Sequence, residues 1–458
     1  MPVRNRLILT GAVAAALLAL PAAAAERARN VILFVGDGMG VSTLTAARIF
    51  EGQRRGVDGT SNLLSFERFP DLALVRTSST NAIVTESAAG ATALMTGHRT
   101  VNGAVGVGET VTLGDCASGK ATAVRSIAEL AKAKGRATGV VTTAAITDAT
   151  PAAVYAHVAS RTWQSDADMP PEALAAGCVD IARQMLDGPT ALQLDVMLGG
   201  GAAAFTPQET TGKRLDGRDL VAEWKAKGGA FVETGSALAA TPKGVRRLLG
   251  LFAGSTMMRE TARKSSESDT PRLVDMTRKA IEVLAQEKRG YFLMVEGGLI
   301  DKAHHQNLAY DALNETAELS EAVAAAVAMT DPKDTLIVVT ADHSHGLTIN
   351  GGRRDTPILG LAPGSADDPA LALDGKPTPI LLYATGPGAP APGEARPDLT
   401  QVDVTDPDQR SYAGIPLGSA AHTGEDVAAF AKGPGSRAFR GLMDQPGVFQ
   451  AMKAAMGL

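Results

Sequence analysis

Four segments of the chain share one pattern, in which a short run of β-branched and other apolar residues is followed at once by acidic or hydroxyl residues. Continuous apolar runs of this length are typical of strands that are buried on both faces, as in a parallel sheet. The polar residues then stand at the ends of the strands. The four runs are residues 30–35, 138–143, 291–295 and 335–340.

Ala-rich stretches of helical character lie between these runs, at 124–134, 273–286 and 310–329. Strands that alternate with helices predict a large α/β domain. In such sheets ligands bind beyond the carboxyl ends of the strands. We therefore expect the four polar clusters to converge on one edge of the sheet.

The stretch from about 350 to 420 has a different character, since it is rich in Pro, Gly and Asp and contains one apolar run, at 380–383. It is predicted to be a loop-rich excursion from the main domain. The sequence otherwise indicates a single domain over residues 26–458.

The N-terminus has the pattern of a secretory signal peptide over residues 1–25. Arg4 and Arg6 precede an apolar run at 7–20. Ala23 to Ala25 then fit the small-x-small pattern of a signal-peptide cleavage site. A helix over that run would be about 21 Å long, short of the roughly 30 Å of a bilayer core. The alternative is an uncleaved membrane anchor. No second apolar run is long enough to span a bilayer, so we expect no membrane span in the mature chain.

The composition is globular, with 45% hydrophobic and 20% charged residues, and the net charge of -5 gives no general attraction to nucleic acid or anionic membranes. Affinity for phosphate must therefore come from a local site. The two cysteines, Cys116 and Cys178, are an even number in a chain expected to be exported. That count favours a disulfide, and two buried thiols are the alternative.

Histidines and carboxylates occur together at two places, and His422 lies in a loop-like setting further along the chain. Asp301 and His305 are four residues apart, which puts both on one face of a helix and turns His304 away from it. Asp342 and His343 follow an expected strand directly. Histidine nitrogen and carboxylate oxygen are zinc ligands, whereas oxygen ligands with retained water suit magnesium. The sequence offers two zinc sites and one magnesium site: Asp301, His305 and His422; Asp37, Asp342 and His343; Asp37, Thr150 and Glu296.

Any single Asp–His pair is more often an ordinary surface pair than a metal site. His98 and His157 are predicted to be structural, and His345 to be a hydrogen-bonding residue near the metals. The charge count favours cations, because four crowded carboxylates would repel one another and take up protons. Three divalent ions would leave about two positive charges, which suits a phosphate dianion. These carboxylates are Asp37, Glu296, Asp301 and Asp342.

Ser87 is the candidate nucleophile. Small residues follow it in helical fashion, so it would lie in the first turn of a helix, where exposed backbone N–H groups and the helix dipole favour an anion. Coordination to a metal can activate a serine; the alternative is an ordinary helix N-cap. Arg161 follows Asp148 at a short distance and can bind two phosphate oxygens, unless it is a solvated surface arginine.

Together these segments resemble the alkaline phosphatase family. The matches are specific as a set and run in order over nearly all of the mature chain. They are Gly36-Asp37-Gly38-Met39-Gly40, Ser87-Ala88-Ala89-Gly90-Ala91-Thr92-Ala93, Asp148-Ala149-Thr150-Pro151, Val295-Glu296-Gly297-Gly298 onward to His305, Thr340-Ala341-Asp342-His343-Ser344-His345, and His422-Thr423-Gly424.

The resemblance implies a three-layer α/β/α sandwich with a large, mostly parallel central sheet. It also implies an exported homodimeric phosphomonoesterase, in the bacterial periplasm, with two Zn²⁺ and one Mg²⁺ per subunit held by the ligands above. Ser87 would become phosphorylated, zinc-bound hydroxide would hydrolyse the phosphoserine, and Arg161 would clamp the phosphate. The substrates would be small phosphate monoesters.

The resemblance mixes two branches of the family. A Cys116–Cys178 disulfide looks like the animal branch, whereas Asp148 and Lys302 look like the bacterial pattern beside magnesium and phosphate. Glu86 stands where the family usually has Asp, so its longer side chain is expected to change how it orients the arginine. Ala253 stands where the animal calcium site has an acidic ligand, so no fourth metal is predicted.

Two other functions are compatible with part of this pattern. A phosphodiesterase or nucleotide pyrophosphatase could share the two zinc sites, but a diester carries one charge less and needs neither Arg161 nor a third metal. A non-catalytic phosphate-binding or metal-storage protein could use the ligands without the serine. The complete ligand set together with Ser87 favours the phosphomonoesterase.

Overall fold

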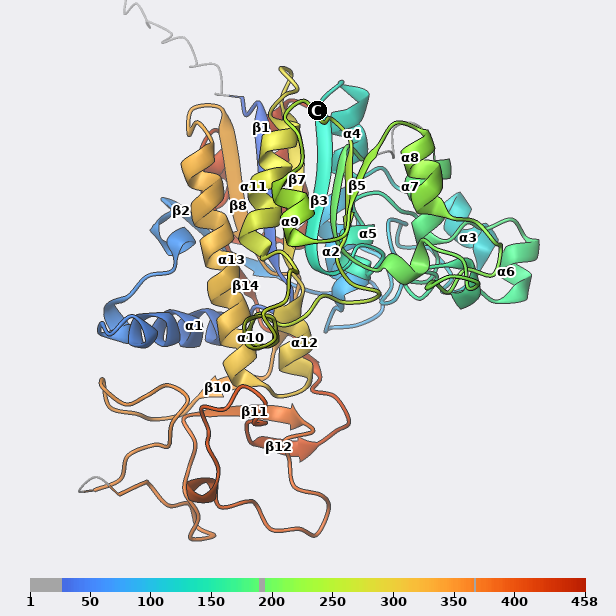
Figure 1. Ribbon diagram of the computed structural model, residues 1–458. Coiled ribbons are helices and arrows are strands. Elements are labelled where there is room, and N and C mark those ends of the chain that lie inside the picture. Colours follow the sequence, from blue (N-terminus) through green and yellow to red (C-terminus); the bar gives the residue numbers. More distant parts are fainter. Residues whose placement is uncertain (1–26, 189–193, 366–367) are drawn as a thin grey trace, which may run out of the picture.

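The computed structural model describes residues 27–188, 194–365 and 368–458. The expected signal peptide, 1–25, lies outside these ranges. A sheet of ten strands forms the centre of the molecule, in the order β15-β2-β14-β8-β1-β7-β3-β4-β6-β5 (Figure 1). Its strands are β1 Asn30–Gly36, β2 Asp71–Arg76, β3 Ala137–Ala145, β4 Val196–Gly200, β5 Ala230–Val232, β6 Leu248–Leu251, β7 Tyr291–Gly297, β8 Thr335–Thr340, β14 Val427–Lys432 and β15 Gly441–Asp444.

Helices cover both faces of this sheet. α11 and α13 pack on one face, and α4 and α14 on the other, where α14 also runs along α2. The helices are α1 Val41–Arg54, α2 Ser87–Thr96, α3 Cys116–Ala121, α4 Ile127–Ala133, α5 Ala149–Ala152, α6 Pro171–Ala175, α7 Ile181–Asp187, α8 Leu220–Ala226, α9 Gly235–Ala239, α10 Glu260–Ser265, α11 Leu273–Leu284, α12 Leu299–His305, α13 Ala309–Met329 and α14 Gln445–Met456. The predicted three-layer sandwich is confirmed.

The four apolar runs of the sequence are the four adjacent strands β8, β1, β7 and β3 at the centre of the sheet. They pair in parallel, as expected. Every residue of β1, β7 and β8 is buried, because helices lie on both faces. Within the described residues β14 is the strand of this sheet that runs against the others. The carboxyl ends of the central strands therefore meet at one edge.

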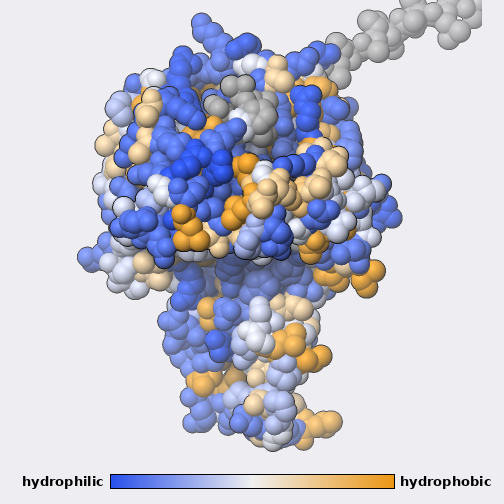
Figure 2. Space-filling model, turned by 90° about the vertical axis from the view of Figure 1, so that its right-hand side faces the viewer, coloured by the Kyte–Doolittle hydropathy of each residue, from blue (hydrophilic) through white to orange (hydrophobic). Residues whose placement is uncertain are grey.

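The predicted excursion projects from that edge as a smaller lobe (Figures 1 and 2). It contains more regular structure than expected, since the apolar run at 380–383 enters a strand of a second, three-stranded sheet, in the order β10-β11-β12. A two-residue pairing, β9 with β13, lies where the chain enters and leaves the lobe. These strands are β9 Ser344–His345, β10 Leu347–Ile349, β11 Leu381–Gly386, β12 Ala413–Pro416 and β13 His422–Thr423.

A disulfide joins Cys116, at the start of α3, to Cys178, just beyond α6, and closes a loop over a sequence separation of 62. Of the two alternatives open from the sequence, the structure has the bridge. None of the helices in the described ranges combines the length and apolarity that crossing a membrane requires.

Candidate active site

The carboxyl ends of the central strands bring the predicted ligands together. Asp37 directly follows β1, Glu296 is the penultimate residue of β7, and Asp342 stands two residues beyond β8. Thr150 lies on α5, which the chain enters shortly after β3. All four side chains are buried, so the carboxylates are largely cut off from water.

The first candidate metal site is built from α12 and β13. Asp301 Oδ2 lies 3.3 Å from His305 Nε2, and Asp301 Oδ1 lies 3.3 Å from His422 Nε2. The two imidazole Nε2 atoms are 3.1 Å apart. His305 Nδ1 donates to the carbonyl of Ala420 at 2.7 Å, which leaves its Nε2 lone pair free to bind a metal. The four-residue spacing predicts this shared face.

The second candidate site lies beside the first. His343 Nε2 is 3.3 Å from Asp37 Oδ1 and 3.4 Å from Asp342 Oδ2. Ligand atoms at zinc-bonding distances of a tetrahedral ion stand about 3.3–3.4 Å from one another. The separations at both sites match that edge length. His345, whose nitrogen atoms also lie near His422 and Asp301, instead donates from Nε2 to Asp301 Oδ1 at 2.7 Å.

Three buried oxygen atoms among these residues make no hydrogen bond in the described chain: Asp37 Oδ1, Asp342 Oδ2 and Thr150 Oγ1. The two carboxylate oxygens face His343 Nε2 in the ion pairs given above. Buried polar atoms in proteins are almost always paired. Each of the three belongs to a residue that the sequence assigned to a metal site. The donor set therefore fits divalent metal ions at this edge of the sheet.

The pKa values of the carboxylates reflect the same crowding. Burial, then the charges of Asp301 and Asp342, raise the pKa of Asp37 to about 7. Burial and the neighbouring Asp37 raise the pKa of Glu296, and burial raises that of Asp342. Burial also opposes charge on Asp301, but hydrogen bonds from His345 and His422 outweigh it and lower its pKa.

His343 lies between two carboxylates that favour the protonated form of its imidazole. Burial disfavours its charge, but Asp342 and Asp37 outweigh burial and raise its pKa to about 10. The proton on the imidazole thus takes the place of a cation between two carboxylates. A metal ion that binds there must displace it.

Ser87 is the first residue of α2 and is buried. Its Oγ lies 3.4 Å from His343 Nε2, which puts it beside the second candidate site. The N-cap is Glu86, not Ser87: the Glu86 carboxylate accepts from the backbone N–H groups of Ala88 and Ala89. The N–H groups of Ala88 and Ala89 are therefore already engaged by Glu86.

Arg161 is held between two carboxylates. One guanidinium nitrogen donates to Glu86 Oε2 at 2.5 Å and the other to Asp148 Oδ1 at 2.8 Å. Lys302 Nζ lies 3.2 Å from Asp148 Oδ2. Burial would raise the pKa of Asp148, but Lys302 and Arg161 lower it to about 2. The extra methylene of Glu86 is accommodated, because this side chain also accepts from Gly103 N at 2.8 Å.

Gly38 shows why the motif after β1 contains glycine. Its φ of 68° is in the left-handed region, and a Cβ there would stand 2.6 Å from Cδ2 of His345. A side chain at position 38 would push away the imidazole that orients Asp301. The backbone N–H of Gly38 donates to Asp342 Oδ1 at 3.1 Å, so the glycine ties β1 to β8 at the site.

Several residues of the site escaped sequence analysis because their types are common everywhere. Thr142 donates to Glu296 and accepts from Ala144 N, and it lies opposite Glu296 where β3 pairs with β7. His304, the weaker ligand candidate of the sequence, is buried between Thr43 Oγ1 and the hydroxyl of Tyr383.

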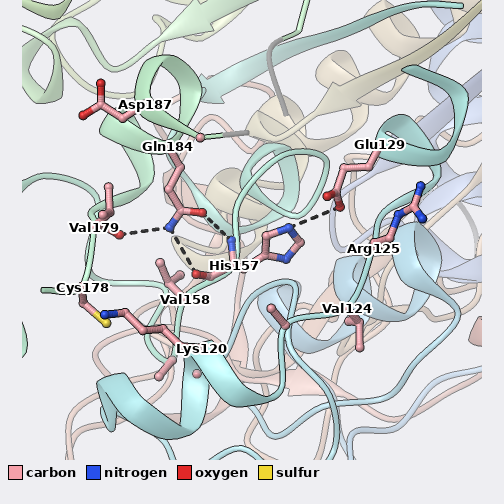
Figure 3. A pocket seen from close by; sticks show the side chains of 14 residues that line it. Lys120, Val124, Arg125, Glu129, His157, Val158, Cys178, Val179, Gln184 and Asp187 are labelled. Carbon is pink, nitrogen blue, oxygen red and sulfur yellow. Dashed lines mark hydrogen bonds and ion pairs between the residues drawn. The ribbon is translucent and has the colours of Figure 1, made fainter. Parts of the chain in front are cut away.

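A cavity of about 420 Å³ lies away from these ligands, beside α3, α4 and α7 (Figure 3). His157 lies in its wall, with Nε2 3.3 Å from Glu129 Oε2 and its backbone N–H donating to Gln184 Oε1. The Gln184 amide donates back to the carbonyl of His157. These polar groups therefore satisfy one another within the wall of the cavity.

A mostly parallel α/β sandwich with histidine and carboxylate ligands at its carboxyl edge defines an enzyme of the α/β class with a candidate metal centre. The sequence profile described as alkaline phosphatase matches residues 28–458. The chain therefore belongs to the alkaline phosphatase family, and it is a phosphate-monoester hydrolase.

Relatives of known activity and known structure agree. The chain is 43% identical to the tissue-nonspecific alkaline phosphatase of Gallus gallus, with 93% of this chain and 84% of the relative covered. The human tissue-nonspecific isozyme is 41% identical, with 91% of this chain and 82% of the relative covered. The alkaline phosphatase of Thermus thermophilus superposes with a TM-score of 0.68 at 27% identity, covering 94% and 92%. The alkaline phosphatase of the Antarctic bacterium TAB5 superposes with a TM-score of 0.67 at 26% identity, and the match covers 94% of this chain and 99% of that structure.

Proton competition predicts how metal binding depends on pH. Asp37, with a pKa of about 7, and His343, with a pKa of about 10, must lose protons before an ion binds. The zinc affinity of metal-free protein should therefore fall at least about tenfold from pH 8 to pH 6. Competition with a chromophoric chelator measures this. Equal zinc affinity at pH 6 and pH 8 would contradict this proton competition. The Asp37→Asn variant should bind zinc more weakly than the wild type at both pH values.

Proposed function

We propose that the chain is an exported, metal-dependent phosphomonoesterase that works through a phosphoserine at Ser87. The observation that carries the proposal is the position of Ser87 Oγ, 3.4 Å from His343 Nε2, at the start of a helix beside the buried ligand cluster. A buried serine in that place is aimed at the charged centre of the site. An ordinary helix cap would not need these neighbours, and here Glu86 provides the cap.

The proposed ligands fall into the three groups that sequence analysis assigned. Zinc would be held by Asp301, His305 and His422 and by Asp37, Asp342 and His343, and magnesium by Asp37, Thr150 and Glu296. When bound, such ions supply Lewis-acid charge and lower the pKa of a serine hydroxyl or of water. His345 would orient Asp301, and Thr142 would orient Glu296 through the hydrogen bonds described above.

The reaction would proceed in two in-line displacements. Ser87 Oγ attacks phosphorus, the bond from phosphorus to the alcohol oxygen breaks, and the alcohol leaves with a proton. Water then attacks the phosphoserine on the opposite side, the bond from phosphorus to Oγ breaks, and phosphate leaves. The serine thereby regains its proton, and the net reaction consumes one water.

Arg161 would bind the phosphoryl oxygens that take no part in the displacement. Two of its five N–H donors are engaged by Glu86 and Asp148, so others remain for phosphate. Its side chain is 26% exposed, open on one side to a ligand. Lys302, 36% exposed, would add charge at the same place. These two cations favour a monoester dianion over a diester.

The remaining parts of the proposal concern the whole chain. Residues 1–25 would direct export to the bacterial periplasm, and residues 26–458 would fold as one domain with the excursion as an insertion. The Cys116–Cys178 disulfide is in keeping with an oxidising compartment. A homodimer is the proposed assembly.

Replacing the nucleophile gives the first test. Ser87→Ala should lower kcat on p-nitrophenyl phosphate by at least about 10³-fold, and it should abolish the phosphoserine trapped by acid quenching with labelled phosphate. Ser126→Ala is the matched control, since Ser126 is also a buried serine at the start of a helix, but on α4. It should keep the label. Label retained in the Ser87 variant would overturn the assignment.

The guanidinium gives the second test. Arg161→Ala should lower kcat/KM for p-nitrophenyl phosphate by about 10- to 100-fold, because charge-assisted bonds to the phosphoryl group are lost. The loss should be smaller for bis-p-nitrophenyl phosphate, which carries one charge less. An equal loss of kcat/KM for both esters would mean that Arg161 does not discriminate between a monoester dianion and a diester. Arg125→Ala, an exposed arginine outside the site, should change neither rate.

A further inference from the structure

Gln445 is the first residue of α14, and its side chain is fully buried. Its Nε2 donates to the backbone carbonyl of Asp342. Asp342 lies beyond the end of β8, where the sheet no longer supplies a donor for this carbonyl. A buried carbonyl needs a donor. In the described chain Gln445 provides it.

The nucleophile helix meets the same carbonyl. A Cβ on Gly90 would stand 3.0 Å from the oxygen of Asp342 and 3.4 Å from Gln445 Nε2. Gly90 follows Ser87 by three residues and so lies on the same face of α2. α14 packs along this helix. The carbonyl of Asp342, the amide of Gln445 and the helix that carries Ser87 therefore meet at one point.

The peptide group held in this way joins two proposed ligands, Asp342 and His343. If it rotates, both side chains move, and so does the 3.4 Å separation of His343 Nε2 from Ser87 Oγ. We propose that Gln445 is a positioning residue, which fixes this peptide against α2 and so sets the second metal site relative to the nucleophile. Gln445 touches neither the ion nor the substrate.

Stability alone does not account for the glutamine. Its Oε1 is buried and has no hydrogen-bond partner in the described part of the chain. A buried unpaired oxygen is unfavourable, so an apolar side chain of similar size would remove one cost while leaving the carbonyl of Asp342 without its donor. The two effects oppose each other. A large loss of stability is therefore not expected on replacement, whereas a loss of positioning is.

Two variants at this position and one on the same helix test the proposal. Gln445→Leu and Gln445→Glu remove the N–H donor at nearly constant size. Phe449→Leu is the matched control: Phe449 is one turn further along α14 and contacts α2 at its far end, beside Gly97, away from Asp342. For each protein the measurements are the zinc affinity and the Tm of the metal-free chain, and kcat and KM on p-nitrophenyl phosphate.

We expect both Gln445 variants to lose about 10- to 100-fold in zinc affinity. Their kcat should fall at least about tenfold, with KM changed by less than about threefold. Gln445→Leu should keep the Tm of the metal-free chain within a few degrees. Phe449→Leu should show the reverse, a lower Tm with unchanged zinc affinity.

The inference rests on the proposed metal sites, and the same experiment separates the two failures. A wild-type chain that binds no zinc would contradict the proposed function itself. Wild-type zinc affinity and kcat in both Gln445 variants would overturn only the role of Gln445. If Gln445→Leu does not fold, the same readouts on Gln445→Glu decide. A lower Tm in the Gln445 variants without any change in zinc affinity would also overturn the positioning role and leave Gln445 with a role in packing alone.

Discussion

The mutual repulsion of buried carboxylates is the constraint on which this structure depends. Asp37, Glu296, Asp301 and Asp342 are all nearly inaccessible to water. The sheet forces them together, because the strands that lead to them are adjacent and parallel. Ionised carboxylates at such distances are stable only with positive charge between them. The raised pKa values of Asp37, Glu296 and His343 reflect this need, because each of these groups holds a proton more tightly than it would in water.

The surrounding fold can be understood as a frame for this cluster. Helices on both faces bury the central strands, so their carboxyl ends have little freedom to move apart. Residues outside the cluster fix the turns that carry ligands. Gly38 has no side chain and so leaves room for the imidazole of His345, and Gln445 donates a hydrogen bond to the carbonyl of Asp342. Charge balance extends outward to Arg161, Asp148 and Glu86, which form a continuous set of ion pairs beside the nucleophile.

Much of this arrangement follows from the sequence. Continuous apolar runs predict the central strands, because short runs rich in β-branched residues are typical of strands covered on both faces. The residues after each run predict the ligands. Contacts that depend on tertiary packing could not be predicted. Nothing near Gln445 or Thr142 in the sequence indicates that they meet Asp342 and Glu296. Nor does the sequence indicate that Glu86 both caps α2 and accepts a hydrogen bond from Arg161.

The excursion shows the same limit. Its Pro, Gly and Asp content predicts loops, but the strands β10, β11 and β12 form because distant segments pair.

We propose that divalent cations, not protons, balance the carboxylates in the working enzyme. Elemental analysis of purified active protein tests it most directly. The account predicts about two zinc ions and one magnesium ion per chain, as in other two-metal sites with an added oxygen site; full activity in protein with no bound divalent metal would contradict it.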